Sequence, residues 1–282
     1  MFIDPFESFP GTILIVAPHM DDEMLACGGI MAMLPHKERI HLVYATAGMK
    51  SPTPIIPWRD AITPDLGEAR IREAQAALRF LGVPTANAHF LRLPEARLKR
   101  HKADLRRRLI ELIERIQPAT IFMPFRYDRH RDHLAINHAL TAVHQQKVWQ
   151  SQLIEYFVYY RWRLLPMRDI RRYIHPQHLL EVDIQAVSSQ KRAALDYFHS
   201  QTTYFYSWQT RPILTPMLLD EVSQTPELFL LYDPHLPGAA IFTKAVPWIR
   251  FVHRVEPFLQ KWKYLAGASL RRALGRHGKA TA

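Results

Sequence analysis

The stretch TILIVAPHMDDE, residues 12–23, indicates the fold class and the place of a functional site. Its first half is an uninterrupted apolar run ending at Ala17, which is typical of a strand buried on both faces of a parallel sheet. Pro18 ends the strand because proline has no N–H group for the ladder. An imidazole and three carboxylates follow within five residues, His19 to Glu23. Because open α/β sheets bind ligands at the carboxyl ends of their strands, we expect a functional site here.

The composition is that of a globular chain. The 282 residues are enough for one large α/β domain or two small ones, and 48% of them are apolar, which allows a sizeable core. The single cysteine, Cys27, excludes an intramolecular disulfide. The acidic N-terminus does not resemble a signal peptide, and no run approaches the roughly 18 apolar residues of a membrane span. These features predict a cytoplasmic protein.

The net charge of +11 is concentrated at the C-terminal end of the chain. Residues 241–282 contain nine Lys and Arg against one acidic residue, Glu256, whereas the first 240 residues are close to neutral. We therefore expect a domain over residues 1–240 and a basic, aromatic-rich tail over residues 241–282.

Segments typical of strands and of helices alternate along the chain. The predicted strands are 12–17, 39–47, 88–93, 120–123, 153–160, 178–182 and 229–232. The predicted helices are 24–34, 65–81, 102–116, a segment ending at about 146, and 184–200. This order predicts an α/β fold with a doubly wound, mostly parallel sheet. Two stretches are predicted to be irregular: most of residues 201–237, and the proline-rich loop Met49–Pro64, whose length suggests a functional role.

A second cluster of histidines and acids follows the strand predicted over residues 120–123. It reads DRHRDH over residues 128–133 and lies more than 100 residues after the first cluster. Both clusters come after a buried strand, so the two should meet at one edge of the sheet.

The two clusters together contain the ligands of a catalytic metal site. His19, Asp22 and His133 supply two imidazoles and one carboxylate, which is a composition used to bind catalytic zinc. Iron or another divalent ion suits the same donor set. Zinc polarises a carbonyl group and lowers the pKa of its bound water to about 7. The alternative is that some of the 15 histidines lie near acids by chance, as surface or capping residues.

Two further side chains of the clusters suit acid–base chemistry. Asp21 is placed to accept the proton of the attacking water. His130 is placed to stabilise an oxyanion or to protonate a leaving amine, with Asp132 holding its tautomer.

The motifs resemble those of a known family. Residues 17–23, APHMDDE, are similar to the A-H-P-D-D-E signature of the PIG-L/LmbE-like family of zinc-dependent N-acetylglucosaminyl deacetylases. Residues 128–133 resemble that family's second signature, D-x-H-x-D-H. Further matches occur in family order over roughly residues 12–201, a strong signal for paired motifs; they are Thr46–Gly48, Arg70 with Glu73, and Lys191 with Ser200–Gln201.

The resemblance implies a Rossmann-like fold and the removal of an N-acetyl group from an N-acetylglucosamine-type amino sugar in a glycolipid, sugar conjugate or glycan precursor. The implied zinc ligands are His19, Asp22 and His133. The implied catalytic residues are Asp21 as general base on zinc-bound water, His130 as electrophile or acid, and Asp132, which orients His130.

The resemblance also implies substrate-binding residues, with less detail. Arg70 matches an arginine that holds sugar hydroxyls, for which a planar fork of donors is suited. Glu95 lies near the position of a sugar-binding acid, although the local match is loose and a solvated loop acid is the alternative. Met20 departs from the family pattern by replacing the usual proline, and Pro18 separates the alanine from the histidine.

The tail allows three interpretations. Residues Pro247–Arg276 interleave aromatic and basic side chains, as an interfacial helix on an anionic membrane surface does. A C-terminal helix docked on the body with solvated cations is the second interpretation. Nucleic acid is the third, and the near-neutral body argues against it.

Rival functions remain open at the level of sequence. A metallo-β-lactamase-like hydrolase needs H-x-H-x-D-H, and Asp128 stands where that motif has its first histidine. A zinc amidohydrolase acting on a sugar–thiol conjugate is a second rival, and a non-enzymatic nucleic-acid- or membrane-binding protein is a third. The sequence carries no signal for the acylated sugar or for the oligomeric state.

Overall fold

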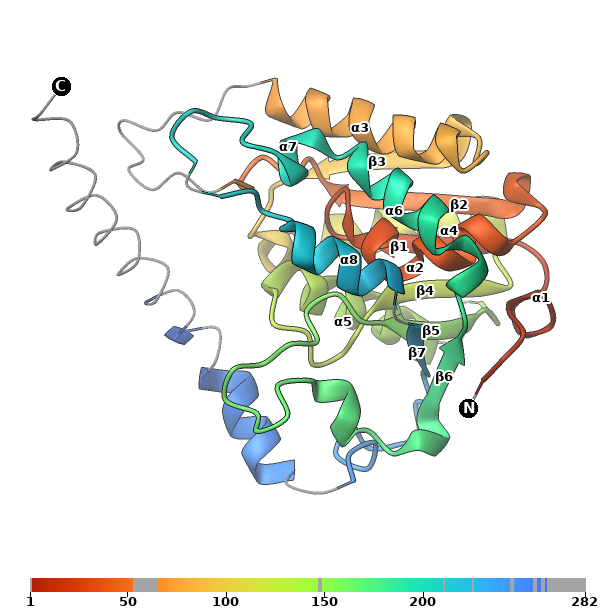
Figure 1. Ribbon diagram of the computed structural model, residues 1–282. Coiled ribbons are helices and arrows are strands. Elements are labelled where there is room, and N and C mark those ends of the chain that lie inside the picture. The colour runs from red at the N-terminus through yellow and green to blue at the C-terminus, as the bar shows by residue number, and fades with distance from the viewer. Residues whose placement is uncertain are drawn as a thin grey trace, which may run out of the picture.

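The computed structural model describes residues 2–52, 65–146, 149–209, 211–224, 226–243, 246–255, 258–259 and 262. These residues form a seven-stranded sheet in the order β3-β2-β1-β4-β5-β7-β6, with helices on both faces (Figure 1). Most of the loop predicted over Met49–Pro64, including Trp58, lies outside the described residues.

Five of the strands are parallel, as predicted. They are β1 (Ile13–Ala17), β2 (Ile40–Thr46), β3 (Ala88–Leu93), β4 (Thr120–Pro124) and β5 (Gln152–Tyr156). The order 3-2-1-4-5 confirms the Rossmann-like prediction. The chain leaves β1 toward β2 and later returns to its other side as β4, so the topological switch point lies between β1 and β4.

The other two strands extend the sheet with the opposite pairing. Strand β7 (Glu227–Leu231) is antiparallel to both β5 and β6 (Leu179–Val182). The resulting sheet is therefore mostly, but not wholly, parallel.

Helices cover the sheet in two layers because the strand side chains alternate between its faces. In β1, Ile13, Ile15 and Ala17 belong to one core, and Leu14 and Val16 to the other, and all five are buried. The first core packs beneath α2 (Asp22–Met33), α3 (Leu66–Phe80), α6 (Ser188–Asp196) and α8 (Pro216–Gln224). The second packs beneath α4 (Lys102–Ile116) and α5 (Arg131–Gln145).

Short elements connect these layers. Two short α-helices are α1 (Pro5–Ser8) and α7 (His199–Thr202). The 3₁₀ turns are η1 (Lys37–Arg39), η2 (Thr85–Asn87), η3 (Leu98–His101), η4 (Ile170–Tyr173), η5 (Pro176–His178) and η6 (Gln185–Val187).

The elements after β4 differ most from the prediction. Helix α8 falls in the stretch predicted to be irregular; Pro216 is its first residue, where proline costs no hydrogen bond. The helix predicted over residues 184–200 is divided into η6, α6 and the start of α7. Strand β5 ends at Tyr156, and the aromatic residues that follow it line a cavity instead of continuing the ladder.

A buried ion pair fixes α2 to the elements beneath it. The Nζ atom of Lys191 in α6 lies 2.8 Å from Oε1 of Glu227 in β7 and donates to the carbonyl of Leu25 at 2.9 Å. The Glu227 carboxylate also accepts from the backbone amides of Gly29 and Ile30 in α2. Helix α2, which begins at Asp22, is therefore held rigidly to the sheet.

The core continues beyond residue 240, where the sequence predicts the start of the tail. Ile241, Phe242, Ile249 and Val252 are buried in the same core as α2. Residues 246–255 form a helix, the blue helix at the lower left of Figure 1. Among the described residues, no helix has both the length and the apolar character needed to cross a membrane.

Candidate active site

The two histidine-containing motifs meet at the switch point of the sheet. His19 follows β1, and Asp21 and Asp22 stand at the start of α2. His130 caps the N-terminus of α5, and His133 lies in its first turn. Because β1 and β4 are adjacent parallel strands, their carboxyl ends bring both motifs to one edge.

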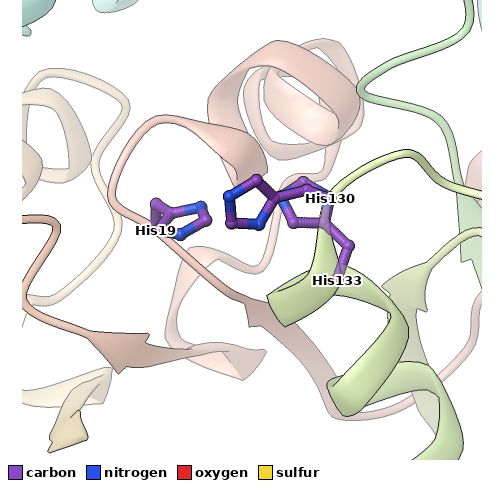
Figure 2. Close-up of side chains that lie close together, drawn as sticks. All are labelled: His19, His130 and His133. Carbon is purple, nitrogen blue, oxygen red and sulfur yellow. The ribbon is translucent and has the colours of Figure 1, made fainter. Parts of the chain in front are cut away.

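Three imidazoles converge there (Figure 2). The ring centroids are 4.7 Å apart for His19 and His130, 5.1 Å for His130 and His133, and 5.5 Å for His19 and His133. One nitrogen from each ring lies within 4.8 Å of the others. The arrangement is compact enough for a single metal ion.

Asp22 connects two of these imidazoles. Its Oδ2 atom is 3.0 Å from His19 Nδ1 and 3.2 Å from His133 Nε2. The structure therefore brings together the three side chains that the sequence predicts as ligands, and it adds His130 beside them.

The electrostatic field of the cluster suits a cation. Burial lowers the pKa of His19 and His133, but the neighbouring carboxylates, including Asp22, outweigh it and raise the two values to about 9 and about 10. For Asp22, burial alone would raise the pKa. The imidazoles of His133 and His19 outweigh burial and hold the pKa of Asp22 well below its usual range. A field that retains protons on buried imidazoles also favours a divalent cation in their place.

Unpaired ring nitrogens provide a direct test of whether the residues fit a metal. His19 Nε2 and His133 Nε2 are buried, and neither makes a hydrogen bond of acceptable geometry with the described residues. His133 Nε2 lies 3.2 Å from Asp22 Oδ2, and His19 Nε2 lies 3.6 Å from Asp132 Oδ2. Two unpaired nitrogens next to carboxylate oxygens fit a divalent ion that prefers nitrogen and oxygen donors.

Asp21 lies next to the cluster in a strained backbone conformation. Its φ of +140° is rare for a residue with a side chain, and its amide donates to Oε2 of Glu23 at 3.0 Å. Burial raises the pKa of Asp21 to about 7, with the cation of Arg70 opposing the rise and Asp22 adding to it. A carboxylate with a pKa near neutrality is well matched to accepting a proton.

Arg70, predicted to bind substrate, is almost fully buried and makes its hydrogen bonds to the protein. Nη2 donates to the carbonyl of Met20 at 2.6 Å and to Asp21 Oδ2 at 3.2 Å, and Nη1 donates to the carbonyl of Gly48 at 2.9 Å. An added Cβ at Gly48 would lie 2.5 Å from the guanidinium. These contacts hold the backbone and carboxylate of the segment that carries Asp21.

His130 is the least basic of the three imidazoles. Burial, then repulsion by His19 and His133, lowers its pKa to about 3. Its Nδ1 accepts from the backbone amide of Asp132 at 3.3 Å, so the proton of the neutral ring is on Nε2. The ring is therefore a neutral hydrogen-bond donor.

The contacts of the Asp132 carboxylate link the second motif to the loop after β3. It accepts from the amides of Ala96 at 2.5 Å and Leu98 at 3.3 Å, and it lies 3.6 Å from His19 Nε2. These partners differ from the His130 ring that the sequence predicts for it, so its role in orienting His130 stays a prediction.

Glu95 lies at the same site. Its Oε1 atom is 3.8 Å from His19 Nε2, and its Oε2 accepts from the backbone amide of Lys50 at 2.6 Å. The structure thus places this predicted substrate residue close to the imidazoles, on a loop that lines the cavity.

Two residues of the site were not identified from the sequence. Asp128 is buried, with Oδ2 3.2 Å from His133 Nδ1 and Oδ1 accepting from the amide of His130 at 2.7 Å. Its place two residues before His130 was the available signal, since metal-ligating histidines are usually oriented by a carboxylate. The Tyr159 ring lies 5.2 Å from that of His133 and carried no signal beyond an aromatic strand.

The site opens into a cavity of about 1070 Å³. Its polar lining includes His19, Asp21, Asp22, Arg70, Glu95 and His130. Its apolar lining comes from α8 and from residues 157–158 and 213–214, and consists of Phe157, Val158, Ile213, Leu214, Leu218 and Val222. Its volume matches the upper end of the range for small-molecule sites, about 300–1,000 Å³.

Comparisons with known proteins agree with this architecture. The family model of the GlcNAc-PI de-N-acetylases, PIG-L, matches residues 14–144, which include both motifs. Among curated proteins, none matches the chain in sequence.

Solved structures share the fold at low sequence identity. The conserved protein TT1542 from Thermus thermophilus is 23% identical, with a TM-score of 0.54 over 80% of this chain and 99% of that one. The N,N'-diacetylchitobiose deacetylase from Pyrococcus horikoshii is 20% identical, with a TM-score of 0.58 over 81% and 85%. The zinc-inhibited form of teicoplanin deacetylase Orf2 is 17% identical, with a TM-score of 0.55 over 79% and 100%. Residues 14–144, the part of the chain that carries both histidine motifs, thus match the PIG-L family model, and the solved structures share the fold.

Proposed function

We propose that the protein is a metal-dependent hydrolase that removes the N-acetyl group from an N-acetylglucosamine-type amino sugar. The observation that carries this proposal is the position of the Asp22 Oδ2 atom, 3.0 Å from His19 and 3.2 Å from His133, with the buried Asp21 beside it. The family match and the deacetylases that share the fold support the reaction class.

His19, Asp22 and His133 would hold the metal. A divalent ion in this site would supply Lewis-acid chemistry, which polarises the amide carbonyl and acidifies water. Zinc is the ion that the family resemblance implies, and Fe²⁺ suits the same donors. Because one relative is described in a zinc-inhibited form, a reconstitution should include several divalent ions.

The residues around the metal ligands account for the proton transfers. Asp21 accepts the proton of the attacking water, for which a pKa of about 7 is suitable. The Nε2–H group of neutral His130 donates to the oxygen of the amide carbonyl as negative charge develops there. The proton held by Asp21 then goes to the leaving amine, so that free amine and acetate are released.

The residues that line the cavity determine which groups the substrate can carry besides its N-acetyl group. Glu95 offers hydrogen bonds to sugar hydroxyls, and the apolar residues of the lining are available to an aglycone. Arg70 acts mainly on Asp21 in this scheme, because its hydrogen bonds go to protein groups. A cytoplasmic location also remains a proposal.

The experiment that tests the function measures free amine released from N-acetylglucosamine and from its lipid, nucleotide and oligosaccharide conjugates. The purified protein should release amine from at least one conjugate, a chelator should abolish the release, and His133→Ala should be inactive. Unchanged release after chelation, or by the His133→Ala variant, would contradict the proposal.

A further inference from the structure

The helix formed by residues 246–255 is apolar on two faces. One face carries Ile249 and Val252, which are buried in the core of the body. The other carries Trp248, 44% exposed, and Phe251, 49% exposed, whose rings stack at a centroid distance of 5.3 Å. Packing against the body accounts for the first face only, so the second is available to a partner.

The same apolar character continues along the described part of the tail. Phe258 is 60% exposed and Trp262 is 59% exposed, and the two rings lie 5.9 Å apart. Leu259 is exposed as well. Phenylalanine and leucine present hydrocarbon without hydrogen-bonding groups, whereas tryptophan combines an apolar body with one N–H donor.

Positive charge accompanies these side chains along the sequence. Arg250 and Arg254 are exposed on the helix, and residues 241–282 contain nine Lys and Arg against one acidic residue. The partner must therefore offer an apolar layer together with negative charge. A lipid bilayer containing anionic headgroups has both, with tryptophan and arginine suited to its interface.

The helix is attached to the loop that carries the second motif. His253 Nε2 donates to the carbonyl oxygen of Asp128 at 3.2 Å, and its ring contacts those of Trp162 and Tyr127 at 5.5 Å each. Asp128 in turn contacts His133. The exposed face is thus carried on a helix that packs directly against the active-site loop.

We propose that Trp248, Arg250, Phe251 and Arg254 form a surface that docks on an anionic membrane. The docking is a property of this helix and does not depend on the deacetylase reaction. It would hold the active-site loop close to the lipid surface without any membrane-spanning helix. A nucleic acid is the competing partner, but the hydrocarbon side chains Phe251, Phe258 and Leu259 would gain little from a phosphate backbone.

The test is co-sedimentation of the full chain with vesicles of phosphatidylcholine, with and without phosphatidylserine. Wild-type protein should sediment with the anionic vesicles and stay in solution with the neutral ones. The double variant Trp248→Ser, Phe251→Ser should bind the anionic vesicles at least tenfold more weakly. Met217→Ser, at a methionine 81% exposed on α8, is the matched control and should bind like wild type.

A second pair of variants tests the charge. Arg250→Gln with Arg254→Gln should weaken binding to anionic vesicles and reduce its salt dependence, whereas Lys99→Gln with Arg100→Gln, on the exposed surface of η3, should not. His133→Ala should lose amine release and keep vesicle binding, which separates this proposal from the proposed function. Failure of wild type to bind anionic vesicles, equal binding by the Trp248/Phe251 variant, or binding to nucleic acid alone would overturn it.

Discussion

The guanidinium of Arg70 lies 3.2 Å from the Asp21 carboxylate and binds the carbonyl of the preceding residue, Met20, at 2.6 Å. One cation therefore fixes both the position of the proposed general base and its strained backbone. It also opposes the effect of burial on the Asp21 pKa, which would otherwise rise above about 7. Arg70 acts as a positioning residue as long as Asp21 is the proton acceptor.

Replacing Arg70 should change the pH dependence of the reaction. The base acts when it is deprotonated, and removing the nearby cation disfavours the charged carboxylate, so the pKa of Asp21 should rise. For Arg70→Met we expect the acidic limb of the kcat/KM profile to move upward by about one pH unit. Arg70→Lys keeps the charge and should move it less. An activity loss of the same factor at every pH would contradict this role.

His130 and Asp22 should differ in their effects on metal binding. Asp22 lies against two imidazoles, whereas His130 is the neutral ring among the three. His130→Ala should therefore keep the metal and lose about 10²–10³-fold in kcat, the usual loss of an oxyanion donor. Asp22→Ala should lose the metal itself. Metal analysis of the purified variants decides between the carboxylate and the third imidazole as a ligand; loss of metal from His130→Ala would favour the imidazole.

Asp128 should tune the affinity of the site for metal. Its carboxylate is 3.2 Å from His133 Nδ1 and would orient that ring toward the ion. Asp128→Asn should weaken metal affinity by about 10–100-fold while leaving the fold intact, as other substitutions behind ligating histidines do. Asp233→Asn, at an exposed aspartate that caps a turn, is the matched control. Equal metal affinity in the two variants, measured by competition with a chelating dye, would show that Asp128 has no such role.

The buried Lys191–Glu227 pair should be important for stability. Lys191→Met would leave the Glu227 carboxylate buried without its cation, and breaking such pairs costs about 3–5 kcal/mol. Arg192, one residue along, forms partly exposed ion pairs with Asp196 and Asp220, and Arg192→Ala should cost less than about 1 kcal/mol. Urea unfolding followed by circular dichroism gives both free energies. Similar losses of unfolding free energy in the two variants would show that burial does not determine the contribution of these ion pairs to stability.

The parts of the fold that were predictable are those set by local pattern. The apolar run of β1 and the punctuation by Pro18 indicate a buried parallel strand, and the same signals recur at β4. Helix α8 and the antiparallel β7 were harder to predict. The helix is a short segment between prolines, and strand direction depends on where the chain returns to the sheet rather than on the sequence of the strand.

In the candidate site, too, local sequence pattern predicted some features and not those that depend on distant parts of the chain. Residue types and strand-end positions were sufficient to predict that His19, Asp22 and His133 meet at one edge of the sheet. The partners of Arg70 and of the Asp132 carboxylate were not predictable, because both bind backbone groups of distant loops. Such contacts depend on how the loops fold over the sheet edge, which no spacing within either motif specifies.

The most direct test of the account is a metal reconstitution that follows amine release. Protein stripped by a chelator should release no amine from an N-acetylglucosamine conjugate that the untreated protein deacetylates. Activity should return in proportion to added metal and reach its maximum at one ion per chain, and His133→Ala should recover none. Full activity of the stripped protein, or a maximum that requires two tightly bound ions, would contradict the single site of His19, Asp22 and His133.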